Sequence, residues 1–180
     1  MAPNAVVGPP GGAGADALQL RRGAAAPGGP LTRRSSDIKT VACGFCGTVV
    51  DTSTDMYKIV SKVEKARGTL SIPAGKVGRF NGTDFEMIGA MQRTAGTGSD
   101  AFTWTEYLLS HEQQGYRWIS EYNGHFSFIS PIKKQPQMAG KLAANYLGSP
   151  FKHFASYNCA VTFVIGEFYW QVRAGDEAAV

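Results

Sequence analysis

Two Asn-Gly pairs, Asn81-Gly82 and Asn123-Gly124, constrain the fold of this chain more than any other sequence feature. Asn and Gly tolerate the positive φ angles of a type I′ turn, so such a pair between alternating apolar and polar residues predicts a two-residue hairpin. The sequence therefore predicts antiparallel strands on both sides of each pair. These strands are expected at residues 77–80, 83–88, 116–121 and 125–130.

A fifth strand is predicted at Phe102–Leu109, where side chains alternate strictly between two directions. Both of its faces carry apolar residues, and no long helical pattern separates the five strands. Short strands joined by tight turns favour a small antiparallel barrel or a strongly curved meander. The expected fold class is mainly β, with residues 73–132 as its central module.

The flanking regions differ in composition. Residues 1–37 hold seven glycines and five of the nine prolines, and so little apolar surface predicts a disordered tail. An organellar targeting sequence is the alternative, because the tail bears Arg and few acids. The other expected divisions are a zinc-knuckle remnant with a β segment at 38–72, a linker at 133–144, and an incomplete second β module at 145–180.

Charge and composition limit the classes of function. The chain has 180 residues, is 43% hydrophobic and carries a net charge of +4, which is enough apolar material for a core. Residues 1–40 hold five basic and two acidic residues, whereas the rest of the chain is nearly balanced. A nucleic-acid-binding protein normally carries its excess of Lys and Arg on the folded surface. Nucleic acid is therefore the less favoured partner.

Cys43 and Cys46 have the spacing of a zinc knuckle, and the glycines beside them allow the backbone to turn toward thiolate sulfur. A structural zinc site needs four ligands. The remaining Cys and His candidates do not repeat the knuckle spacing: they are His111, His125, His153 and Cys159. Zinc binding is thus an incomplete hypothesis, no other cofactor is expected, and the odd number of cysteines favours a reducing compartment.

Trp104, Glu106, Arg117 and Trp118 are the candidates for a binding surface on the strands. The Trp rings could stack on bases, but their period-two placement also fits an aromatic core. Glu106 could act as a general acid or base, but a strand carboxylate is more often solvated or paired with a cross-strand cation such as Arg117. We therefore expect no catalytic residues.

Three segments resemble a known family: Phe85–Gly89, Trp104–Leu109 and Tyr116–Glu121, together with a Gly-Glu-Phe-aromatic-Trp run at Gly166–Trp170. They are similar to the bacterial domain-of-unknown-function family numbered 4178, over roughly residues 41–175. That resemblance implies small β modules, often preceded by a zinc ribbon with two Cys-x-x-Cys knuckles, and no assigned enzymatic activity. It also implies partners among membrane-stress or polyamine-related complexes. Both ends of the chain depart from the family pattern, which suggests a truncated gene product.

The favoured interpretation is a non-catalytic interaction module that binds a protein partner or a membrane-associated complex through a loop rim or sheet edge. One alternative is a small barrel that binds RNA or single-stranded DNA. Another is an enzyme that uses Cys43 or Glu106. No run of about 20 apolar residues and no compact signal-peptide core occur, so a cytoplasmic location is expected.

Overall fold

The structure is a computed structural model, and it describes residues 37–43, 48–53, 58–62 and 70–180. The predicted disordered tail, apart from Asp37, and Cys46 of the knuckle lie outside the described residues. The strands are β1 (Thr40–Ala42), β2 (Thr48–Asp51), β3 (Lys58–Lys62), β4 (Val77–Phe80), β5 (Thr83–Ala95), β6 (Phe102–His111), β7 (Gly115–Tyr122), β8 (His125–Ile129), β9 (Gln137–Met138), β10 (Ala143–Tyr146), β11 (Ser149–Lys152), β12 (Asn158–Phe168) and β13 (Glu177–Ala179).

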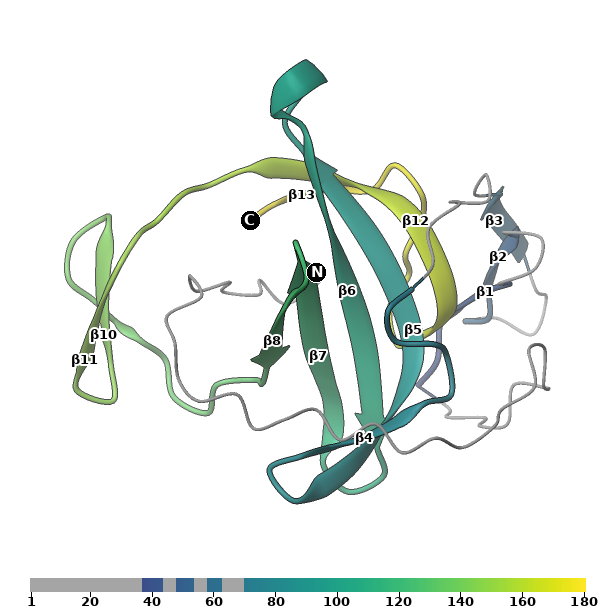
Figure 1. The fold of residues 1–180 in the computed structure, drawn as a ribbon, viewed down its shortest axis with the longest axis horizontal. Helices are drawn as coiled ribbons and strands as arrows, with labels where there is room; N and C mark the ends of the chain where they lie inside the picture. Colours follow the sequence, from purple (N-terminus) through teal and green to yellow (C-terminus); the bar gives the residue numbers. More distant parts are fainter. Residues whose placement is uncertain (1–36, 44–47, 54–57, 63–69) are drawn as a thin grey trace.

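Ten of these strands form one antiparallel sheet with the order β3-β2-β1-β12-β5-β6-β7-β8, while β4 pairs with β5 and β13 pairs with β12 (Figure 1). Both predicted hairpin turns are confirmed. Asn81 and Asn123 each have a φ of 49°, and the glycines that follow have φ values of 78° and 76°. These angles are those of a type I′ turn, whose twist matches that of the flanking strands.

The strands from β4 to β8 curl around one apolar core, which contains Phe85, Met87, Tyr107, Leu109 and Ile119. The curl brings the Phe80 ring of β4 onto the Phe128 ring of β8, with centroids 4.8 Å apart and planes 11° apart. The stack shows that the sheet is strongly curved, and among the described residues no ladder joins β4 to β8 to close it. The prediction of a mainly β, antiparallel fold is confirmed in its curved-meander form.

A second core lies where β12 pairs with β5 in the middle of the sheet, and it contains Met91, Leu108, Val164 and Phe168. In this ladder Gly166 of β12 pairs with Gly89 of β5. A Cβ atom on Gly166 would lie 2.2 Å from the Ile88 carbonyl oxygen, and one on Gly89 would lie 2.6 Å from the Glu167 carbonyl oxygen. Only glycine fits such a close approach of two backbones.

β12 lies in the segment 145–180, which was predicted as an incomplete second β module. It pairs with β5 on one side and with β1 on the other, so this strand is part of the main sheet. The apolar residues of β12 complete the core of the central strands, which is why this segment belongs to the same sheet. The linker expected at 133–144 contains β9 and the start of β10.

A small second sheet, with the order β11-β10-β9, projects from the main sheet (Figure 1). Its hairpin turns at Leu147-Gly148, which have φ values of 51° and 83°. In the described part of the chain the single helix is the 3₁₀ turn Gly98–Asp100, and no helix there is long and apolar enough to cross a bilayer.

Candidate functional site

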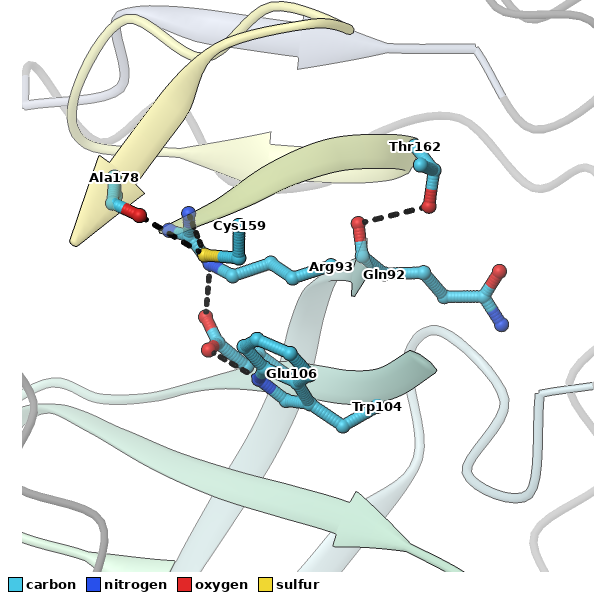
Figure 2. Close-up of polar contacts among 7 residues, drawn as sticks. All are labelled: Gln92, Arg93, Trp104, Glu106, Cys159, Thr162 and Ala178. Atoms are coloured by element: carbon cyan, nitrogen blue, oxygen red, sulfur yellow. Dashed lines mark hydrogen bonds and ion pairs between the residues drawn. The ribbon is translucent and has the colours of Figure 1, made fainter. Parts of the chain in front are cut away.

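A polar network of four side chains lies between β5, β6 and β12, and Figure 2 shows it. The Glu106 carboxylate accepts a hydrogen bond from Trp104 Nε1 at 2.8 Å and one from Arg93 Nε at 3.1 Å. Arg93 Nη1 lies 4.0 Å from the Cys159 sulfur, whose thiol donates to the Ala178 carbonyl oxygen at 3.4 Å. The side chains of Arg93 and Glu106 are only 13% and 14% exposed.

Two of the predicted site residues, Trp104 and Glu106, belong to this network. Trp104 was a candidate for either a binding surface or an aromatic core; it is only 8% exposed and packs with Ala95 and Cys159. Glu106 was interpreted as either a solvated carboxylate or a cross-strand partner of a cation such as Arg117; in the structure its cation is Arg93 on the neighbouring strand. A carboxylate whose two oxygens both accept hydrogen bonds in a nearly closed site is well placed to hold strands together.

A second buried polar group lies in the curled core. Tyr107 is fully buried, and its hydroxyl donates a hydrogen bond to Glu121 Oε2. Ser71 Oγ donates to the other carboxylate oxygen at 2.6 Å, and the Ser71 amide donates to the Tyr107 hydroxyl at 3.2 Å. Burial, followed by the hydrogen bond and charge of Glu121, raises the pKa of Tyr107 to about 12.

We predict that Tyr107 is among the last tyrosines to ionise. The pKa of Tyr107 is higher in the folded chain than its ordinary value of 10, so folding favours the protonated phenol. Its contribution to stability is complete below about pH 10 and is lost as the pH rises toward 12. Phenolate absorbance should show a late titration step that disappears in Tyr107→Phe and shifts to lower pH in Glu121→Gln. Titration of every tyrosine near pH 10 would contradict this arrangement.

Arg117 and Trp118 lie on β7 but do not form one surface with Trp104. The Trp118 ring is half-buried against Trp170, with centroids 5.2 Å apart. Arg117 Nη1 donates to the carbonyl oxygens of Gln114 and Tyr116 at 2.8 and 2.7 Å, and its guanidinium lies 5.8 Å from the Phe85 ring centroid. The residues considered for a stacking surface therefore lie apart: Trp104 and Trp118 belong to two different cores, and Arg117 lies at a hairpin end.

Cys43 is exposed at the end of β1, whereas Cys159 is buried in β12. The residue before Cys43, Ala42, pairs with Gly166. Cys159 lies seven residues from that glycine, roughly 23 Å along the strand. The structure thus separates Cys159 from Cys43, and among the described residues no group of three His, Cys, Asp or Glu side chains gathers around a metal position.

The outer edge of β8 ends the ten-stranded sheet. Tyr122 and His125 flank the two-residue turn and therefore exchange both hydrogen bonds with each other. The alternation of an antiparallel ladder then directs the amide and carbonyl groups of Phe126 and Phe128 away from β7. Their side chains are also 44% and 36% exposed. Outward-directed backbone groups and partly exposed side chains thus lie together at this edge, where the Phe128 ring also stacks on Phe80 of β4.

Sequence reasoning missed the partners of the predicted residues. Arg93 bonds to Glu106, and Tyr107 bonds to Glu121. The sequence predicted the strands that carry these carboxylates, but it did not show which strands are neighbours in the sheet. Glu167 was noted only as part of a motif, yet it is 7% exposed, and burial followed by the charge of Glu86 raises its pKa. The exposed apolar side chains beyond β8 carried a sequence signal, because they lie in a long stretch without acidic residues.

The fold and these sites define a class of protein: a mainly β chain whose large, curved antiparallel sheet contains buried polar networks and ends at β8 on one side. A model of the family described as Domain of unknown function (DUF4178) matches residues 73–180, and the chain belongs to that family. The matched range covers β4 to β13 and begins after Cys43 and Cys46. Neither the curated proteins nor the solved structures contain a significant match to the chain.

Proposed function

We propose that this protein is a non-catalytic interaction module that binds an extended segment of a protein partner along the outer edge of β8. The observation that carries the proposal is the combination of outward-facing backbone groups and exposed rings at Phe126 and Phe128. Addition of a strand to a sheet edge gains affinity from main-chain hydrogen bonds and specificity from alternate side chains.

The composition of β8 supports this proposal. Native proteins usually protect an exposed edge with charged residues or proline. The strand His125–Ile129 contains neither Lys, Arg, Asp, Glu nor Pro. Phe128 is held by its stack on Phe80, so part of the binding surface is already ordered. The partner segment is therefore expected to be extended and to carry apolar residues at alternate positions.

The polar networks are less suited to catalysis than to support of the sheet. The Glu106 oxygens are occupied by Trp104 and Arg93, and Glu121 is held by Tyr107 and Ser71. The burial of Trp104 also weakens the alternative of base stacking, which requires an exposed ring. Strand addition at β8 uses groups that have no role in either network.

A selection from a random peptide library on the immobilised protein tests the proposal. We expect enriched peptides with alternating apolar residues, and we expect Phe126→Pro to abolish their binding. Proline removes the outward amide, yet the fold should tolerate it because that amide makes no ladder bond to β7. Phe126→Ala is the matched variant, since it removes the ring and keeps the amide.

The two variants should differ in a defined way. Phe126→Ala should weaken the peptides by roughly tenfold, the order expected for loss of a partly buried aromatic contact, whereas Phe126→Pro should leave no measurable binding. Circular dichroism and thermal unfolding verify that both variants fold. Equal binding by Phe126→Pro and the original chain would place the partner elsewhere and overturn the proposal.

A further inference from the structure

The stretch from Tyr122 to Gly166 has an unusual charge distribution. It contains four lysines, no arginine, and no Asp or Glu. The resulting charge of +4 equals the net charge of the whole chain, because the excess of three basic residues in 1–40 is offset by an excess of three acidic residues in the remaining segments. The charge totals of residues 1–40 and 41–180 do not show this local concentration of lysine.

The same stretch exposes large apolar side chains in the projecting sheet. Met138, Leu142 and Leu147 are 68%, 64% and 72% exposed, and Phe151 and Phe154 are 52% and 78% exposed. Isolated exposed apolar residues are normal in folded proteins, but a contiguous set marks an interaction surface. Met138 and Phe151 lie on β9 and β11. Leu142 and Leu147 lie just before and just after β10, and Phe154 follows β11. The small sheet lies away from the main sheet (Figure 1).

The strand register shows that this small sheet is amphipathic. Met138, Ala144 and Phe151 are direct cross-strand neighbours, so their side chains share one face. Tyr146 lies two residues after Ala144 on β10 and therefore points to that face as well. The opposite face carries polar side chains, namely those of Gln137, Asn145 and Lys152.

We infer that the sheet β9-β10-β11 docks on an anionic membrane surface, with the Leu147 turn and the face of Met138 and Phe151 in the interfacial region. Lysines attract anionic lipids from the surrounding surface, and exposed aromatic and aliphatic side chains enter the headgroup boundary. The projecting position of the hairpin allows its apolar end to reach a flat surface. The surface that we name the lysine hairpin consists of residues 137–152.

The choice of residues favours lipid over other macromolecules. Protein interfaces are depleted of lysine and enriched in arginine, and arginine is also preferred for bidentate recognition of nucleic-acid phosphates and bases. All four cations of the stretch are lysines, which act as hydrated point charges. Lysine charge beside an exposed apolar turn matches the combined electrostatic and hydrophobic requirements of a lipid surface.

Vesicle co-sedimentation with the full chain tests the inference. We expect binding to phosphatidylcholine vesicles that contain phosphatidylserine, little binding to pure phosphatidylcholine, and release at high salt. The double variant Lys141→Gln, Lys152→Gln should bind roughly 25-fold more weakly, at about fivefold for each lysine. Lys39→Gln, at an exposed position beside β1, is the matched control and should bind as the original chain does.

The apolar contribution is tested at the turn. Leu147→Asn should reduce binding several-fold without loss of stability, because asparagine tolerates the positive φ at this position. Val77→Thr changes an exposed apolar residue of β4 and should have no effect on lipid binding. Phe126→Pro should also bind vesicles normally, so this inference and the β8 proposal can fail separately.

Two results would overturn the inference. One is the absence of binding to anionic vesicles, or binding that the lysine and Leu147 variants do not change. The other is equally tight binding to a short DNA duplex that Leu147→Asn leaves unaffected, which would indicate a general polyanion site. Preference for anionic vesicles over the duplex, together with sensitivity to Leu147→Asn, supports docking on a membrane.

Discussion

Replacement of Gly166 by alanine is expected to lower the free energy of unfolding by about 4 kcal/mol, the sum of backbone strain and overpacking. Gly166 has a φ of 87°, and a Cβ there would lie 2.2 Å from the Ile88 carbonyl oxygen and 2.8 Å from Gly89 Cα. Both neighbours are backbone atoms, so β5 and β12 would have to separate. A fall of roughly 10 °C in the midpoint of thermal unfolding should follow.

Gly175→Ala separates the two causes. Gly175 has the same φ of 87°, but no atom lies within 4 Å of the position of its Cβ. This variant should therefore lose only about 1 kcal/mol, the cost of the backbone conformation. Similar losses in the two variants would show that the close approach of β5 and β12 has little importance.

Glu106→Gln is expected to lower the free energy of unfolding by about 3 kcal/mol, since loss of one partner from a largely buried ion pair leaves an uncompensated charge. The amide can still accept from Trp104 Nε1, but its NH₂ group cannot accept from Arg93 Nε. The midpoint of urea unfolding, with an unchanged slope, measures the loss.

A double-mutant cycle assigns this loss to the pair. In Arg93→Met, Glu106→Gln the buried charge is removed with its partner, so the double variant should be clearly more stable than the sum of the single losses implies. A fully stable Glu106→Gln variant would free this carboxylate from a structural role, and the enzyme hypothesis would then gain support.

Local features of the fold were predictable because they depend on neighbouring residues. The Asn-Gly turns and the alternation of Phe102–Leu109 specify hairpins and strands without any distant contact. The place of β12 depends instead on contacts across the chain: it lies between β1 and β5, more than sixty residues from either in sequence. Strand order of this kind has no local signal, so the sequence did not show that β12 lies between these two strands.

The candidate site was predictable in its residue types and not in its pairings. Glu106 was identified, but Arg93 faces it only because β5 and β6 pair in the observed register. The sequence left Trp104 either in an aromatic core or on a binding surface, because alternation alone does not say which face of a strand is covered. The β8 edge could be anticipated only as one of several possible edges, since the sequence does not show which strand is last.

The two proposals concern two separate surfaces of the molecule. The β8 edge offers backbone groups beside Phe126 and Phe128, whereas the lysine hairpin offers charge and an apolar turn. A module with both could hold a protein partner at a membrane surface. The two surfaces use different residues, so variants at one leave the other as an internal control.

Amide hydrogen exchange on β8, measured by NMR with and without a selected peptide, tests strand addition most directly. The amides of His125, Ser127 and Ile129 face β7 and should be protected already in the free protein. We predict that saturating peptide slows exchange at Phe126 and Phe128, the two outward amides, by more than at any other position of the strand. Tight peptide binding that leaves exchange at these two amides unchanged would contradict the central claim.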